Sequence, residues 1–191
     1  MISIGNVIFT ENVTIVRMIT IAGQGAENTE MNGNASGSVF SIQTDEPVTL
    51  KNLKITNGLA EDGGGIHQVN RVLVVENSTV TGNSASFRGG GIFSQSAFGT
   101  ASTTIIYSNI NGNAARNRGG GIVNEGDDAT VTIVDSSIND NSASEGGGIF
   151  NLGALSIDNS IFSSNSAGQG CGAYNPGVFM SANISLGGNS A

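Results

Sequence analysis

The chain is poor in the residues that mark several common protein classes. It contains one cysteine, Cys171, so an internal disulfide is impossible, although this alone does not fix the compartment. It has no tryptophan, 2 prolines and only 5% aromatic residues. Charged residues make up 12% of the chain, against about 25% in ordinary domains. Asn, Ser and Thr must therefore supply most of its solubility.

Basic residues and long apolar runs are scarce as well. The chain has 7 Lys and Arg against 15 Asp and Glu, for a net charge of -8. This balance argues against a nucleic-acid groove and against a basic surface for anionic lipids. No run reaches the roughly 18 apolar residues of a membrane span, so we expect no membrane insertion. The first residues lack the pattern of a signal peptide, so a secreted protein would be present here in mature form or as a fragment.

Glycine is abundant, with 29 residues, and much of it lies in a repeated Gly-Gly-Gly-Ile motif. The motif begins at residues 63, 89, 119 and 146, and a decayed copy, Gly170-Cys171-Gly172-Ala173, begins at 170. The starts lie 26, 30, 27 and 24 residues apart. The triplets lack the following Lys and the helix start of a phosphate-binding loop, so we interpret them as corners. A period in this range predicts a solenoid.

A second motif places an apolar residue three positions before an asparagine. Its copies are Val80 and Asn83, Ile110 and Asn113, Ile138 and Asn141, and Phe162 and Asn165. Between the two motifs lies a short alternating segment such as Val131-Thr132-Ile133. Segments of three to five residues with period 2, separated by Gly and Asn turns, favour strands over helices.

Stacking of successive coils at the spacing of paired strands, about 4.8 Å, places equivalent residues on top of one another. We therefore expect three buried aliphatic columns and one ladder of amide side chains. The first column is Ile66, Ile92, Ile122 and Ile149. The second is Ile55, Val80, Ile110, Ile138 and Phe162. The third is Val75, Ile105, Ile133 and Ile157. The ladder is Asn83, Asn113, Asn141 and Asn165, in which each amide bonds to its neighbours.

These paired motifs resemble the GGA-I and F-x-x-N repeats of polymorphic outer-membrane proteins. They are also similar to bacterial surface proteins with right-handed parallel β-helix repeats. Residues 19–26, followed by Met31-Asn32-Gly33-Asn34, resemble the first coils of those proteins. The resemblance implies an extracellular or cell-surface protein of pectate-lyase-like architecture. The chain departs from it in having GGG for GGA, mostly Ile or Val for the Phe, and no visible β-barrel anchor.

From the motifs and the resemblance together, we predict an all-β fold. It is a single-stranded right-handed parallel β-helix of about seven coils with three short strands per coil. One domain spans residues 1–191, with less regular first coils over 1–62 and the regular repeats over 63–191.

A catalytic centre is not indicated. Carboxylate pairs and Ca²⁺ sites need acids held close together. The acids here are scattered, and no two regular coils carry one at the same strand position. His67, the only histidine, follows a glycine triplet and should point outward. We therefore expect no catalytic residue, metal site or cofactor.

The residue after each Gly-Gly-Gly-Ile isoleucine should face outward, because strand side chains alternate. This outer stripe consists of His67, Phe93, Val123, Phe150 and Tyr174. One interpretation is an exposed apolar contact surface. The other is that the side chains stabilise the sheet by cross-strand stacking, or lie under loops. The residues before the triplets should form the pairs Asp62–Arg88 and Arg118–Glu145.

The two ends of the solenoid should expose strand edges, which recruit further strands unless capped. We expect the N-terminal end to present Ile2, Ile4 and Val7, and the C-terminal end Ile184, Leu186 and Asn189. Head-to-tail contact between them would build a filament. The competing interpretation is that flanking repeats of a longer surface protein continue the coils.

The sequence thus favours a non-enzymatic extracellular structural or adhesive β-solenoid. Its expected partner is a second copy or the flanking repeats, with surface glycans as a further candidate. The alternative is a carbohydrate-binding or polysaccharide-degrading enzyme similar to pectate lyases.

Overall fold

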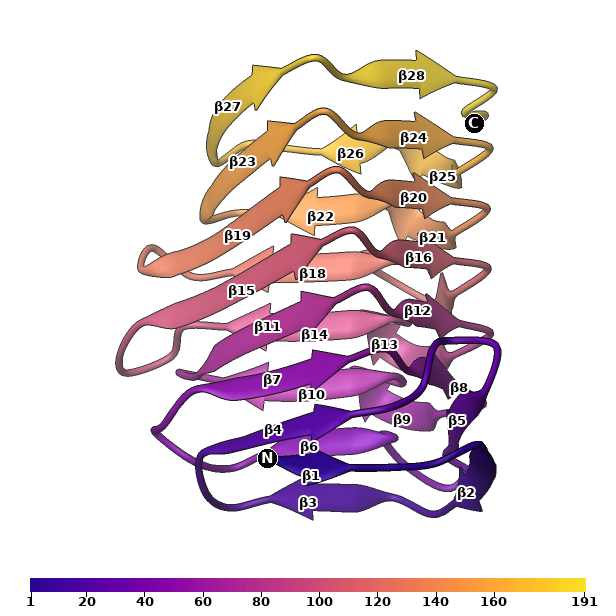
Figure 1. Ribbon diagram of the computed structural model, residues 1–191. Coiled ribbons are helices and arrows are strands. Elements are labelled where there is room, and N and C mark those ends of the chain that lie inside the picture. Colours follow the sequence, from indigo (N-terminus) through magenta and orange to yellow (C-terminus); the bar gives the residue numbers. More distant parts are fainter.

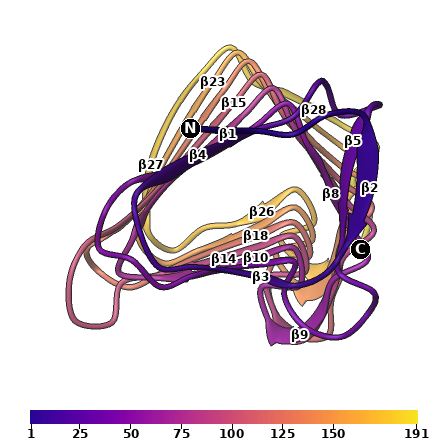
Figure 2. The same cartoon turned by 60° about the horizontal axis from the view of Figure 1, so that its bottom comes forward.

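The chain folds into 28 strands and no helix in this computed structural model, which describes residues 1–191 (Figure 1). The strands form four parallel sheets, A to D, with 8, 8, 7 and 5 strands. Seven full turns separate the first and last of the eight strands in sheet A. Seen from the N-terminal end, the chain turns clockwise as it recedes, so the solenoid is right-handed (Figure 2). The predicted β-helix is confirmed.

Sheets A, B and C form the three sides of each coil (Figure 2). Sheet A consists of β1 (Ile2–Ser3), β4 (Ile19–Ala22), β7 (Val48–Lys51), β11 (Val72–Glu76), β15 (Ala101–Ile106), β19 (Ala129–Val134), β23 (Ala154–Asp158) and β27 (Val178–Ala182). Sheet B consists of β2 (Val7–Thr10), β5 (Thr29–Asn32), β8 (Lys54–Thr56), β12 (Thr79–Thr81), β16 (Asn109–Asn111), β20 (Ser137–Asn139), β24 (Ile161–Ser163) and β28 (Ser185–Gly187). Sheet C consists of β3 (Val13–Ile15), β6 (Phe40–Ile42), β10 (Ile66–Val69), β14 (Ile92–Gln95), β18 (Ile122–Glu125), β22 (Ile149–Asn151) and β26 (Ala173–Tyr174).

Sheet D is a fourth strand position that the sequence analysis did not separate from the third. It consists of β9 (Leu59–Asp62), β13 (Ser84–Arg88), β17 (Ala114–Ala115), β21 (Ser142–Glu145) and β25 (Ser166–Gln169). Its strands follow corner residues in the left-handed region, with φ between 54° and 63°, namely Asn57, Gly82, Gly112, Asp140 and Ser164. One such residue reverses the local curvature and turns the chain outward. Sheet D therefore projects from the three-sided body as a narrow arch (Figure 2, β9).

The glycine triplets bring each arch back to sheet C. The first glycine adopts positive φ, as in Gly89 at 66°. The second passes close to a strand of sheet D, and a Cβ on Gly120 would lie 2.4 Å from the Ser142 carbonyl oxygen. A Cβ on Gly90 would lie 2.3 Å from the Ala114 carbonyl oxygen. Both carbonyls belong to the next coil, so a side chain at this position would hold the coils apart, which explains the motif. Cys171 takes the same position in the last coil, which no further coil of the chain follows.

The three predicted columns all lie in the core. Strand register pairs their members directly, for example Ile92 with Ile122 and Ile110 with Ile138. Nearly all are completely buried, within one cluster of 25 residues. The register also extends the second column to Phe9 at one end and Leu186 at the other. Alternating aliphatic residues at a regular period therefore predicted these columns, but a further buried column was missed, namely Leu73, Thr103, Val131 and Leu155.

The asparagine ladder is present and has a fifth member, Asn189. From Asn113 onward, each amide oxygen accepts from the backbone N–H and the Nδ2 of the preceding asparagine, as Asn141 Oδ1 does from Asn113 at 3.0 Å. Each Nδ2 also donates to a core-strand carbonyl, as Asn141 does to Ile110 at 2.9 Å. Because the amides of this ladder are hydrogen-bonded, the ladder stabilises the corner between sheets B and D.

A second ladder, of serines, lines the corner between sheets A and B and was missed in the sequence analysis. The backbone N–H of one serine donates to the Oγ of the next at 3.1 Å. Its members are Ser78, Ser108, Ser136 and Ser160. Each lies two positions before a residue of the second column, so the same spacing argument would have found it.

Candidate functional site

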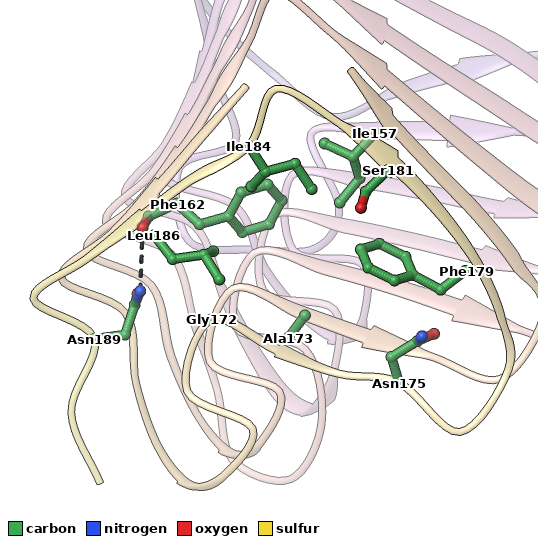
Figure 3. A pocket seen from close by; sticks show the side chains of 10 residues that line it. All are labelled: Ile157, Phe162, Gly172, Ala173, Asn175, Phe179, Ser181, Ile184, Leu186 and Asn189. Atoms are coloured by element: carbon green, nitrogen blue, oxygen red, sulfur yellow. Dashed lines mark hydrogen bonds between the residues drawn. The ribbon is translucent and has the colours of Figure 1, made fainter. Parts of the chain in front are cut away.

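The C-terminal face of the solenoid is hollow. A cavity of about 500 Å³ opens there, and its apolar lining comes from β23, β24 and the last coil (Figure 3). The apolar lining residues are Ile157, Phe162, Ala173, Phe179, Ile184 and Leu186. Leu186 is 70% exposed and Phe179 46% exposed, because no further coil covers them in this chain. These side chains therefore form an unfilled continuation of the core.

Small residues account for the depth of this cavity. In the first column, Ala173 of β26 follows Ile149, and in the third, Ser181 of β27 follows Ile157. Both replace a large aliphatic residue at the last position of their column. The C-terminal face is consequently recessed at the first and third columns.

The N-terminal face carries large residues at the equivalent positions. Val13 of β3 begins the first column, and Ile2 of β1, which is 53% exposed, begins the third. Ile4 is partly buried against the core, and Val7 lies on the edge strand β2. The predicted end residues thus do occupy the two end faces. Three residues of the last strands shape the C-terminal face most, but the sequence analysis missed them because they depart from the repeat. They are Ala173, Phe179 and Ser181.

Asn189, predicted as an end residue, is the last member of the asparagine ladder. Its Oδ1 accepts from Asn165 at 3.0 Å, and its Nδ2 donates to the Phe162 carbonyl at 3.1 Å (Figure 3). The backbone N–H groups of the four preceding ladder asparagines each donate to the next amide oxygen. The N–H of Asn189 has no such acceptor within the chain. It is free to donate to a further coil.

The outer stripe is not exposed, which corrects one interpretation from the sequence. Phe93, Val123 and Phe150 are 1%, 0% and 2% exposed and form a small second core. The rings stack in pairs, His67 on Phe93 with centroids 5.4 Å apart and Phe150 on Tyr174 at 5.2 Å. The structure therefore matches the other interpretation, in which cross-strand stacking stabilises sheet C.

Charged side chains from the arches cover this second core. The Arg88 guanidinium lies 4.7 Å from the centre of the Phe93 ring, and Arg118 lies 4.7 Å from that of Phe150. The predicted pairs form, with Arg88 2.9 Å from Asp62 and Arg118 3.1 Å from Glu145. Alternation along a strand gives the direction of a side chain, but it does not say whether a neighbouring coil will cover it. That is why the sequence left both interpretations of the outer stripe open.

Glu125, which the sequence analysis missed, joins the two ion pairs by contacting both arginines. A hydrogen bond to Asp62 raises the pKa of Arg88, and the carboxylates of Glu125 and Asp62 add to this against the opposing effect of burial. Burial lowers the pKa of His67, while Asp62 opposes this shift and Arg88 reinforces it. These charged groups contact one another and the rings, so we interpret them as parts of the second core.

The remaining acids are dispersed. Glu30 pairs with Lys54 at 2.9 Å, and Asp45 pairs with Arg71 on a loop. No group of three or more His, Cys, Asp or Glu side chains gathers in the structure. With no helix formed, there is also none that could span a membrane.

No protein-family profile, curated protein or solved structure matches this chain. The two end faces are therefore considered on their own geometry.

Proposed function

We propose that the chain is a non-enzymatic structural β-solenoid that stacks end to end with further copies of itself. The observation that carries this proposal is the complementarity of its two end faces. The C-terminal face is recessed at Ala173 and Ser181, whereas the N-terminal face presents Val13 and Ile2 at the same columns. A second copy placed in register would insert its large residues into the cavity and continue the core.

The energetics favour such a contact. Burial of a Leu, Ile or Phe side chain is worth about 1.5–3 kcal/mol, and Phe179, Leu186 and Ile2 are all substantially exposed. Edge strands also have unpaired backbone groups that another strand can satisfy. A head-to-tail contact of this kind does not close, so it would produce a filament.

The resemblance to polymorphic outer-membrane protein repeats supports an extracellular or cell-surface location for this scaffold. The covering of the outer stripe by arginines favours a structural role over an adhesive one for that row. The alternative occupant of each end face is a flanking coil of a longer chain.

Two complementary variants test the proposal. Phe179→Asp places a charge on the C-terminal face and leaves the N-terminal face intact, whereas Ile2→Asp does the reverse. We expect untagged wild-type protein to form filaments, each variant alone to be monomeric, and an equimolar mixture to form dimers only. Sedimentation velocity and negative-stain electron microscopy would measure this.

Phe98→Asp is the matched control, because Phe98 is 99% exposed on a side loop, away from both faces. It should form filaments like the wild type. A wild-type protein that stays monomeric at high concentration would refute self-stacking, as would filaments of either end-face variant.

A further inference from the structure

A polar groove lies on the side of the solenoid, at the corner between sheets A and B. Figure 1 shows this corner where β15 leads into β16. Its larger part has a volume of about 700 Å³, and a smaller part of about 230 Å³ continues it toward the N-terminal coils. Tyr107 and Asn109 line both parts. Ser108, Ser136 and Ser160 of the serine ladder lie in the larger part. The groove crosses several coils and is separate from both end faces.

Tyr107 is the unusual residue of this groove. It has a φ of 51°, in the left-handed region, where a bulky side chain is an outlier. In the other coils this corner is occupied by Asn or Asp at similar φ, at Asn52, Asn77, Asp135, Asn159 and Asn183. These short side chains tolerate the conformation and bond along the row, as Asn77 does to Asn52 at 2.8 Å. Tyr107 interrupts this row, and it is itself 60% exposed.

Strained backbone at one coil, with an exposed ring in a groove, suggests a function for that ring. The surrounding groups are mostly amides and hydroxyls, including Asn109, Asn159 and Ser185, and Ile161 adds a half-exposed apolar side chain. Asp135 is the only charged residue of the larger part, and Glu27 the only one of the smaller part. No Lys, Arg or His lines either part. A polyanion would therefore find repulsion and no counter-charge here.

We propose that this groove binds an uncharged, linear glycan that runs along the solenoid axis. The ring of Tyr107 provides an apolar platform for the C–H face of one sugar, and its hydroxyl can bond in the plane of the ring. The amides and hydroxyls can donate to or accept from sugar hydroxyls, and the Asp135 carboxylate can accept from them. Because coils repeat at about 4.8 Å, successive sugars meet successive sets of these groups.

Isothermal titration calorimetry with cellohexaose, chitohexaose and mannohexaose tests the assignment. We expect at least one to bind the wild type with a Kd of about 1 mM or lower. Tyr107→Asn restores the residue type that the other coils use at this corner. It should weaken binding at least about tenfold, with a Tm equal to or above that of the wild type.

Tyr174→Phe is the control, since Tyr174 stacks on Phe150 in the outer stripe and lies outside the groove. It should bind as the wild type does. Three outcomes would overturn the proposal: no binding of any neutral hexasaccharide to the wild type, unchanged affinity in Tyr107→Asn, or tighter binding of hexagalacturonate than of the neutral sugars.

Discussion

The first coils and the regular coils solve the same stacking problem with different means. Residues 1–62 contain no glycine triplet, and in the asparagine-ladder row Gly58 donates its N–H to Asn83 instead of providing an amide. Residues 63–191 have both features. Yet the first column runs without a break from Val13 through Phe40 into Ile66. Aliphatic columns alone therefore establish the register, and the ladder and arches are additions to it.

The arches allow the regular coils to bury a second core outside the first. Four of the five arches of sheet D supply a charged residue next to the outer stripe, and Arg88 and Arg118 cover its rings. At the register position of His67, the preceding coil has Ser41 and no ring. The difference shows that the second core depends on the arches. Three comparisons of variants test how far the two regions differ.

The largest effect is expected from Ile122→Asp, in the middle of the first column. Ile122 is completely buried, so the variant places an unpaired charge in the core, at a cost of several kcal/mol, and should not fold. Val13→Asp changes the same column at its partly buried beginning and should fold with a lowered Tm. Far-UV circular dichroism of dilute protein would measure both. Equal Tm values for Ile122→Asp and wild type would contradict the assigned core.

An intermediate effect is expected from Asn141→Ala, which interrupts the ladder. The N–H and Nδ2 of Asn113 lose their acceptor, and the Ile110 carbonyl loses its donor. Each unsatisfied buried group costs about 1–3 kcal/mol, so we expect a loss of about 2–5 kcal/mol in the free energy of unfolding.

Asn6→Ala is the matched control, because Asn6 is exposed in the first coils, has no left-handed backbone that would penalise alanine, and belongs to no ladder. Urea denaturation should show a change within about 0.5 kcal/mol for this variant. A similar loss in both variants would mean that the ladder contributes no special stability.

The smallest effect concerns the boundary between the two regions, at His67. Burial lowers the pKa of His67 in the folded state. The unfolded state therefore binds its proton more readily, and stability should fall as the pH drops below the ordinary histidine value of about 6.5. His67→Phe, which copies the residue of the next coil, should remove this part of the pH dependence. Melting curves between pH 7.5 and 5 would compare the two proteins, and parallel curves would refute the assignment.

The sequence was informative where one coil repeats the next. In-register stacking converts a period along the chain into contact in space, so Ile92, Ile122 and Asn113 were placed by spacing alone. The sequence was less informative at positions where the residue type varies from coil to coil although the backbone conformation stays the same. The corner residues before sheet D are Asn, Gly, Asp or Ser. They share a positive φ but no single residue type, so no motif marks them in the sequence. The covering of Phe93 by Arg88 and the shape of the last coil depend on side-chain reach, which the repeat pattern does not contain.

The parallel pairing of every sheet also has a mechanical consequence. Backbone hydrogen bonds join each coil to the next, so they lie along the long axis of the solenoid. A load spread over both end faces stretches all the bonds between two coils together, and the bonds share it. A load applied at one terminus instead strains the nearest strand first and peels the outer coil away. A stack of this protein should therefore resist stretching between its faces far better than it resists unravelling from a chain end.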